Sequence, residues 1–243
     1  MEKTTIRTEA QSMQTYARIA GALFLISMVA GFFGELYVPN KLIVSGDATA
    51  TANNIIASSS LLRLSFAGYL IEAVCDIVLA WLFYVLLRPV NRNLALLSAF
   101  FGLVSTATFA GIELFYFAPT FILGGAAYLK TFSPDQLNSL AMLLLRFYGV
   151  GAGLFMVFYG TGWLIRGYLI SRSGYLPKFL GWILMLAGLG FIIRNFLLVL
   201  APAYASDFLL APMFVGGLTL MLWLFVKGID VSKWEARAAA KSE

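Results

Sequence analysis

The sequence predicts an all-α membrane protein, a polytopic bundle of six transmembrane helices. Hydrophobic residues make up 60% of the 243 residues and charged residues only 12%, whereas soluble domains average about 25% charged residues. Six apolar stretches each approach the roughly 20 residues that a helix needs to cross the hydrocarbon core. These stretches are Ile19–Val38, Leu61–Leu87, Leu94–Ala118, Leu140–Ile170, Leu180–Leu200 and Phe208–Val226.

The chain divides into an N-terminal segment (1–18), a transmembrane domain (19–226) and a basic tail (227–243). The first apolar stretch lacks a small-x-small cleavage site at its end, which is typical of a retained helix rather than a signal peptide. No polar stretch is long enough for a separate soluble domain.

The basic residues predict the orientation of the helices, because cytoplasmic loops carry an excess of Lys and Arg. They gather before the first helix, in the loops after the second and fourth helices, and in the tail. Both termini are therefore expected in the cytoplasm, and the protein in the bacterial cytoplasmic membrane. The residues concerned are Lys3, Arg7, Arg18, Arg88, Arg92, Arg166, Arg172, Lys178, Lys227, Lys233, Arg237 and Lys241.

Local signals refine two of the outer loops and one helix face. Asp47 precedes an alanine-rich run and predicts a short surface helix over Ala48–Ala57 with Asp47 as its N-cap. Ser133-Pro134-Asp135-Gln136 is a capping-box pattern, so the fourth transmembrane helix is expected to begin near Pro134. Gly149, Gly153 and Gly160 share a face of the fourth transmembrane helix with Arg146 and favour close helix packing.

Seven ionisable residues lie within or at the outer ends of the apolar segments, where each charge is costly and is expected to face protein or trapped water. Glu72 and Asp76 share one helix face because they are four residues apart. Glu35 and Arg63 are shallow and are expected at the membrane interface. The predicted substrate-binding residues are Glu72, Asp76, Glu113, Arg146 and Arg194.

Three functions fit these charges. In a binding or transport protein, an outward-facing cavity would take a small polar or cationic solute, with Glu72 and Asp76 as acceptors and Arg146 and Arg194 as counter-charges. In a structural protein, the same residues would form an ion-pair network that fixes helix register. An intramembrane enzyme would use Glu72 or Asp76 as a general base. Four acids against three bases leave one carboxylate over, which slightly favours the first function.

Composition excludes several kinds of chemistry. The chain has no histidine, which excludes His-ligated haem, His-ligated zinc and a His general base. We expect no cofactor and no metal site. The net charge of +5 comes mainly from loops and tails that face lipid headgroups, so membrane lipids and not nucleic acids are the expected partners.

Four stretches of the chain are similar to one known family, over about Tyr16–Val226. They resemble the domain-of-unknown-function family 4386, a group of six-helix bacterial membrane proteins, and the resemblance implies this topology but no activity, cofactor or substrate. Relatives often carry arginine where Gly102 stands, so a family site that uses that arginine would be altered here. The four stretches are Tyr16–Gly21, Gly46-Asp47-Ala48, Leu87–Leu97 and Ser173–Gly181.

Overall fold

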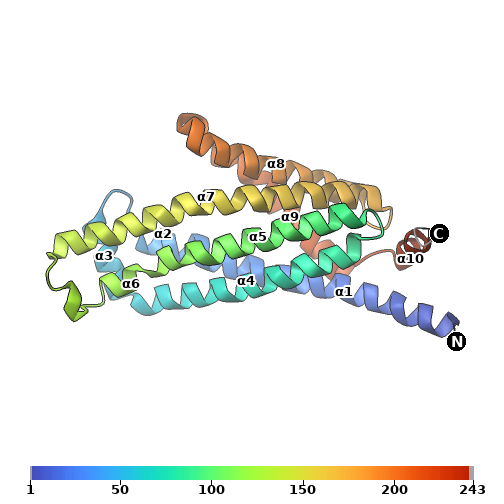
Figure 1. Ribbon diagram of the computed structural model, residues 1–243, viewed down its shortest axis with the longest axis horizontal. Coiled ribbons are helices and arrows are strands. Elements are labelled where there is room, and N and C mark those ends of the chain that lie inside the picture. The colour runs from blue at the N-terminus through green and yellow to red at the C-terminus, as the bar shows by residue number, and fades with distance from the viewer. Residues whose placement is uncertain (1, 241–243) are drawn as a thin grey trace. The chain divides into compact units, whose positions relative to one another are not determined.

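Every regular element in the computed structural model is a helix over residues 2–240, the residues that the structure describes (Figure 1). Side chains are described for residues 12–240. Met1 and residues 241–243, at the outer ends of the predicted terminal segments, lie outside the described residues. Within it, six helical segments are long and apolar enough to cross a membrane, which confirms the predicted fold class. They are Ser12–Leu42, Ser59–Leu87, Arg92–Ile122, Pro134–Ser173, Lys178–Leu200 and Asp207–Val226.

Shorter elements complete or connect the spans. A π-helical turn over Phe32–Tyr37 joins α1 to α2, and short 3₁₀ turns occur between α6 and α7 and between α8 and α9. The helices are α1 Glu2–Gly31, α2 Val38–Leu42, α3 Ala48–Ala57, α4 Ser59–Leu87, α5 Arg92–Phe117, α6 Pro119–Ile122, α7 Pro134–Ser173, α8 Lys178–Leu200, α9 Ala211–Val226 and α10 Val231–Ala239.

The two predicted helix starts are confirmed. The Ala50 N–H donates to the Asp47 side chain at 2.8 Å, so Asp47 is the N-cap of α3. At the start of α7, the Ser133 N–H donates to the Gln136 side chain at 2.8 Å, and the Gln136 N–H donates to the Ser133 hydroxyl at 3.3 Å. Both caps satisfy backbone donors that a helix start leaves without partners.

The sequence did not predict the π-helical turn. Together with Pro39, this turn leaves the Gly34 carbonyl without a backbone donor. The Val38 N–H donates to the Phe33 carbonyl, five residues back. In the same spacing the Gly34 carbonyl would receive the N–H of residue 39, but proline has none. The Gly34 carbonyl therefore takes its hydrogen bonds from side chains.

Contacts divide the chain into two compact units. The first unit comprises Met1–Leu25, Cys75–Ser105 and Phe155–Glu243. The second unit comprises Ile26–Val74 and Thr106–Leu154. Helices α1, α4, α5 and α7 contribute residues to both.

Glycines bring α7 and α8 close together in the first unit. A Cβ added to Gly167 would lie 2.6 Å from the Gly181 carbonyl oxygen, and one added to Gly188 would lie 2.5 Å from the Gly160 oxygen. The close packing predicted at Gly149 is wrong, because a Cβ there would meet nothing within 4 Å, whereas that predicted at Gly160 is confirmed, because a Cβ there would lie 2.8 Å from the Gly188 carbonyl oxygen. Small residues thus allow close backbone approach at Gly160 and Gly167, about three and five turns further along α7 than Gly149.

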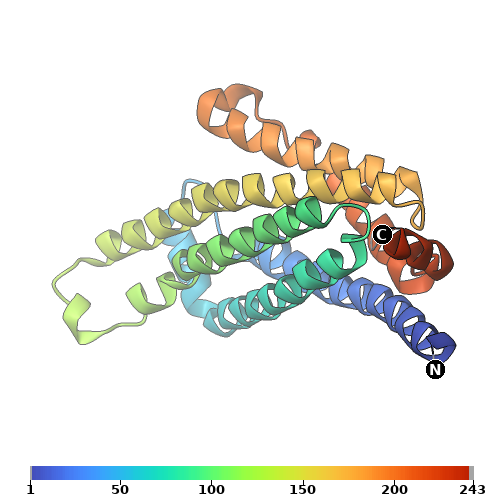
Figure 2. The same cartoon turned by 45° about the vertical axis from the view of Figure 1, so that its right-hand side comes forward.

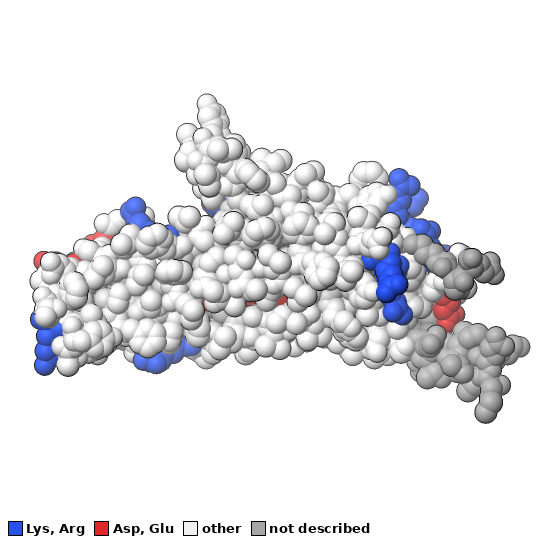
Figure 3. All heavy atoms as spheres, viewed as in Figure 1, with Lys and Arg blue, Asp and Glu red and all other residues white. Residues whose placement is uncertain are grey.

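Large apolar side chains are exposed along the membrane-spanning helices. Val29, Leu64, Val74 and Val199 are each more than half exposed. On the face drawn in Figure 3, residues other than Lys, Arg, Asp and Glu form most of the surface. Such a surface contacts lipid rather than water.

Candidate functional site

The five predicted site residues divide between the two units. Glu72, Glu113 and Arg146 belong to the second unit, and Asp76 and Arg194 belong to the first. Glu113 is 2% exposed, whereas Glu72 and Asp76 are half-buried and Arg146 is exposed. Each unit therefore holds its own set of charges.

Glu113 lies among three tyrosines of the second unit. Glu113 and Tyr116 are three residues apart on α5, Tyr69 comes from α4 and Tyr148 from α7. The ring centroid of Tyr116 is 5.5 Å from that of Tyr69 and 5.0 Å from that of Tyr148. The Glu113 carboxyl group interacts electrostatically with all three phenols. Three helices thus meet around one buried carboxyl group.

The Gly34 carbonyl accepts hydrogen bonds from the same group of side chains. The Tyr69 hydroxyl donates to it at 2.7 Å, and the Ser65 hydroxyl lies 3.3 Å from both the Gly34 oxygen and the Tyr116 hydroxyl. Ser65, Tyr69 and Tyr116 are at most 1% exposed. The acceptor that Pro39 leaves without a helical donor is therefore satisfied by α4 side chains inside the unit.

Counting hydrogens along the cluster constrains Glu113. The Tyr69 hydroxyl lies 3.1 Å from the Tyr148 hydroxyl. Tyr69 has a single hydroxyl hydrogen, and when that hydrogen goes to Gly34, Tyr148 must donate to Tyr69. Tyr148 then offers Glu113 only an acceptor. Although Tyr148 acts on the Glu113 carboxyl group, neither carboxyl oxygen has a hydrogen bond of acceptable geometry among the described residues.

Two more of the seven ionisable residues predicted in or at the ends of the apolar segments are carboxyl groups of the second unit, Glu35 and Glu72. Glu35, in the π-helical turn, was expected at the interface, but its carboxylate acts electrostatically on Glu113. The Glu72 carboxylate packs against α1, since a Cβ added to Gly31 would lie 3.1 Å from a Glu72 oxygen. The unit's arginines are elsewhere: Arg63 and Arg146 are exposed, and the Arg63 guanidinium lies 5.9 Å from the ring centroid of Phe117.

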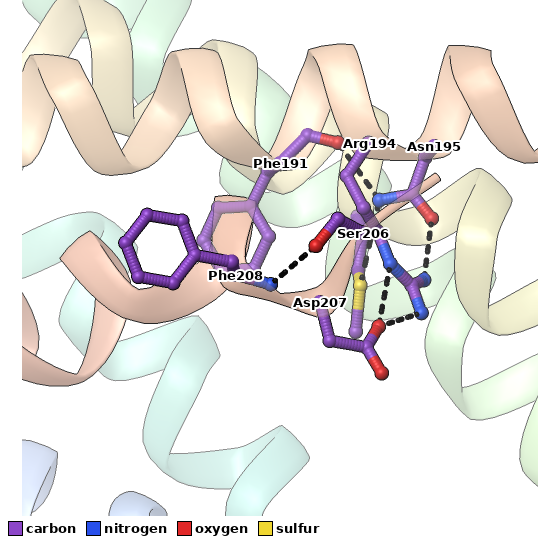
Figure 4. A network of polar contacts seen from close by, with 7 residues as sticks. Phe191, Arg194, Asn195, Ser206, Asp207 and Phe208 are labelled. Carbon is purple, nitrogen blue, oxygen red and sulfur yellow. Dashed lines mark hydrogen bonds and ion pairs between the residues drawn. The ribbon is translucent and has the colours of Figure 1, made fainter. Parts of the chain in front are cut away.

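Arg194 pairs with a residue that the sequence analysis did not connect to it (Figure 4). Its guanidinium donates to one Asp207 carboxylate oxygen from Nη2 at 2.7 Å and from Nε at 3.2 Å. Nη1 donates to the Asn195 side chain at 3.3 Å, and Asn195 in turn donates to the Phe191 carbonyl at 2.8 Å. This network ties α8 to the turn before α9, so the expected pairing of Arg194 with the α4 carboxylates is replaced by a local one.

Arg166 is a buried charge that was not among the predicted site residues. The sequence analysis counted it among the basic residues at the cytoplasmic ends of the helices. It is 6% exposed, and its guanidinium carbon lies 4.2 Å from the centroid of the Phe83 ring. Asp76 and Tyr159 act on it electrostatically. A Cβ added to Gly102 would lie 3.9 Å from Nη2 of Arg166, so this guanidinium occupies the space in front of Gly102. The sequence signal that could have identified Arg166 as buried was its position, four residues before the end of the predicted apolar segment Leu140–Ile170.

The six apolar spans and the charges buried among them define a multi-pass integral membrane protein. Residues 19–228 match the model of the protein family described as "Domain of unknown function (DUF4386)". The chain belongs to this family, as the four sequence stretches predicted.

The chain is 28% identical over 169 residues to an "Uncharacterized protein" of the archaeon Archaeoglobus fulgidus. The match covers 70% of this chain and 86% of that relative. No solved structure matches the chain.

Proposed function

We propose that this membrane protein binds a small cationic solute at the Glu113 carboxyl group, as a solute-binding or transport protein. The observation that carries the proposal is the state of Glu113. It is 2% exposed, and among the described residues it has no ion pair and no hydrogen bond of acceptable geometry. A carboxylate in apolar surroundings requires either a proton or an opposite charge.

The surroundings of Glu113 favour a cation over other ligands. Tyr69, Tyr116 and Tyr148 present aromatic rings on three helices, and ring faces attract alkylammonium ions. The Glu35 carboxylate adds negative charge close to Glu113. A proton and a cation would compete for the same carboxylate, which is the arrangement that exchange of one for the other requires.

The other predicted residues take different places in this proposal. Glu72 remains a second acceptor in the same unit. Arg194 is engaged by Asp207, and Arg166 is the cation on which Asp76 acts. The proposed site therefore rests on Glu113 and uses neither Asp76, Arg146 nor Arg194.

A structural role is the second candidate, and the Gly34 carbonyl favours it. The hydroxyls of Ser65 and Tyr69 satisfy this acceptor within the unit. In that case the buried polar groups hold α4 against the π-helical turn, and Glu113 carries a proton that completes the chain of hydroxyls.

We also propose that both termini are cytoplasmic in a cell membrane, which the charges of the loops support. The native Cys75 is buried, so single cysteines placed at the exposed residues Lys130 and Arg92 can report sidedness. In intact cells an impermeant maleimide should label Lys130→Cys and should reach Arg92→Cys only after permeabilisation. The reverse pattern would contradict the orientation.

Thermal unfolding in detergent tests the binding proposal. The wild type is measured across pH with sodium, potassium and small alkylammonium ions, beside Glu113→Gln and the control Asp135→Asn, whose carboxylate is exposed at the start of α7. At least one cation should raise the midpoint of the wild type and the control but leave Glu113→Gln unshifted. If no cation shifts the wild type while Glu113→Gln is strongly destabilised, the structural role is correct.

A further inference from the structure

The tail forms a helix that is fixed to the rest of the first unit. Helix α10 appears as a short separate helix near the C-terminus (Figure 2). The Leu86 carbonyl accepts hydrogen bonds from the Trp234 indole N–H at 2.9 Å and from the Tyr175 hydroxyl at 2.7 Å. Trp234 and Tyr175 are 6% and 3% exposed. The indole of α10 is thus buried where α4 ends.

The end of α4 explains why the Leu86 carbonyl is available. In a continuing helix it would receive the Val90 N–H, but this N–H donates to the Leu87 carbonyl at 3.0 Å in the turn that contains Pro89. Two side-chain donors take its place. The order Leu-Leu-Arg-Pro at the end of α4 therefore creates the acceptor on which α10 docks.

Backbone bonds hold the segment that leads into α10. The Asp230 N–H donates to the Tyr175 carbonyl at 3.0 Å, and the Ile229 N–H donates to the Gln14 side chain at 3.0 Å. Gln14 in turn donates to the Lys227 carbonyl at 2.9 Å. Gly228 has φ +69°, and a Cβ there would collide with the Gln14 side chain, so only glycine fits. α10 consequently has a defined position relative to α1, α4 and α7.

The docked helix and its two neighbouring loops expose basic side chains and little free acid. Asp230 accepts from the Ser232 hydroxyl at 2.7 Å and pairs with Lys233 at 2.9 Å, so its charge is engaged within the helix start. Glu235 is half-buried. The exposed cations are Arg88, Arg92, Arg172, Lys178, Lys233 and Arg237.

We propose that α10, the 88–92 turn and the 172–178 turn together form a surface that binds the phosphate headgroups of anionic phospholipids. Both turns connect membrane spans, which end at Leu87 and Ser173 and resume at Arg92 and Lys178, so their cations lie at headgroup depth. Lys and Arg bind phosphate strongly, and each cation near an anionic surface contributes roughly fivefold in affinity. Docking by Trp234 adds the cations of α10 to those of the turns.

Native mass spectrometry of the full chain in detergent, with phosphatidylglycerol or phosphatidylcholine added, measures this preference. The wild type should retain phosphatidylglycerol over phosphatidylcholine. Arg92→Gln/Arg237→Gln should lower the affinity for phosphatidylglycerol by on the order of tenfold or more. The matched control Lys41→Gln/Lys130→Gln removes two exposed cations of the second unit and should leave it unchanged.

Two further arms distinguish the surface from general charge attraction and from a soluble ligand. Trp234→Ala keeps every charge but removes the indole and the hydrogen bond to Leu86 that dock α10, and should lower the preference for phosphatidylglycerol several-fold. The proposal would be overturned if Arg92→Gln/Arg237→Gln and Lys41→Gln/Lys130→Gln lost equal affinity for phosphatidylglycerol. It would also be overturned if Trp234→Ala preferred phosphatidylglycerol as strongly as the wild type does. Inorganic phosphate should not displace the lipid; displacement at comparable concentration would identify a site for soluble phosphate instead.

Discussion

The Tyr69 hydroxyl donates a 2.7 Å hydrogen bond to the Gly34 carbonyl. This acceptor exists because Pro39, five residues further on, has no N–H to offer within the π-helical turn. One proline on the first span thereby requires a hydroxyl on α4, and that hydroxyl in turn accepts the Tyr148 hydroxyl hydrogen, so that Tyr148 offers Glu113 only an acceptor. Backbone geometry and the candidate site are linked through a single buried acceptor.

Tyr69→Phe should destabilise the protein, because the Gly34 carbonyl then keeps only the longer Ser65 contact. Leaving a buried acceptor poorly satisfied costs about 1–3 kcal/mol in soluble proteins, and hydrogen bonds between membrane helices average about 0.6 kcal/mol. We therefore expect a loss of about 1 kcal/mol in reversible unfolding. Tyr128→Phe, at a residue that is 74% exposed, should show no loss.

Pro39→Ala should reduce the cost of Tyr69→Phe, although residue 39 makes no side-chain hydrogen bond to Tyr69. Alanine restores an N–H that can donate to Gly34, so the carbonyl no longer depends on the phenol. A double-mutant cycle of unfolding free energies should give a coupling of about 0.5–1 kcal/mol. Strictly additive costs would show that Pro39 is not the reason why Gly34 needs side-chain donors.

Features set by local sequence could be predicted, and pairings across helices could not. The six spans depend on composition, and the caps at Asp47 and Ser133 depend on three or four neighbouring residues. Glu113 was recognisable as a buried charge, but its tyrosine neighbours come from three different helices. Arg194 pairs with Asp207 in the 3₁₀ turn before α9, and no periodicity indicates such a contact. Charge position alone could not decide which partner each residue meets.

Asp230→Asn should destabilise the start of α10 in a way that depends on pH. Hydrogen bonds from Ser232 and Lys233 lower the pKa of Asp230 from 3.8 to about 2. A lowered folded-state pKa stabilises the fold above the unfolded value, and the contribution is lost as pH falls from 3.8 toward 2. The difference in unfolding between wild type and variant should be constant above this window and vanish below it. A difference that persists in acid would indicate that the amide disrupts the cap itself.

Asp76 and Arg166 should behave as one pair. Arg166 is 6% exposed and the half-buried Asp76 acts on it electrostatically, so removing Asp76 leaves a charge in an apolar interior and removing Arg166 leaves a partly buried carboxylate. Breaking a buried pair typically costs about 3–5 kcal/mol, whereas replacing both partners by apolar residues is often close to neutral. Asp76→Leu and Arg166→Met should each destabilise the protein by about this amount.

The double variant Asp76→Leu/Arg166→Met should unfold closer to wild type than either single variant does, because neither charge is then left alone. Unfolding titrations of the four proteins in the cycle measure this coupling directly. If Asp76→Leu costs little while Arg166→Met costs much, Arg166 is held by Phe83 and Tyr159 instead. Asp76 would then contribute little to holding Arg166, and the two residues would not act as a pair.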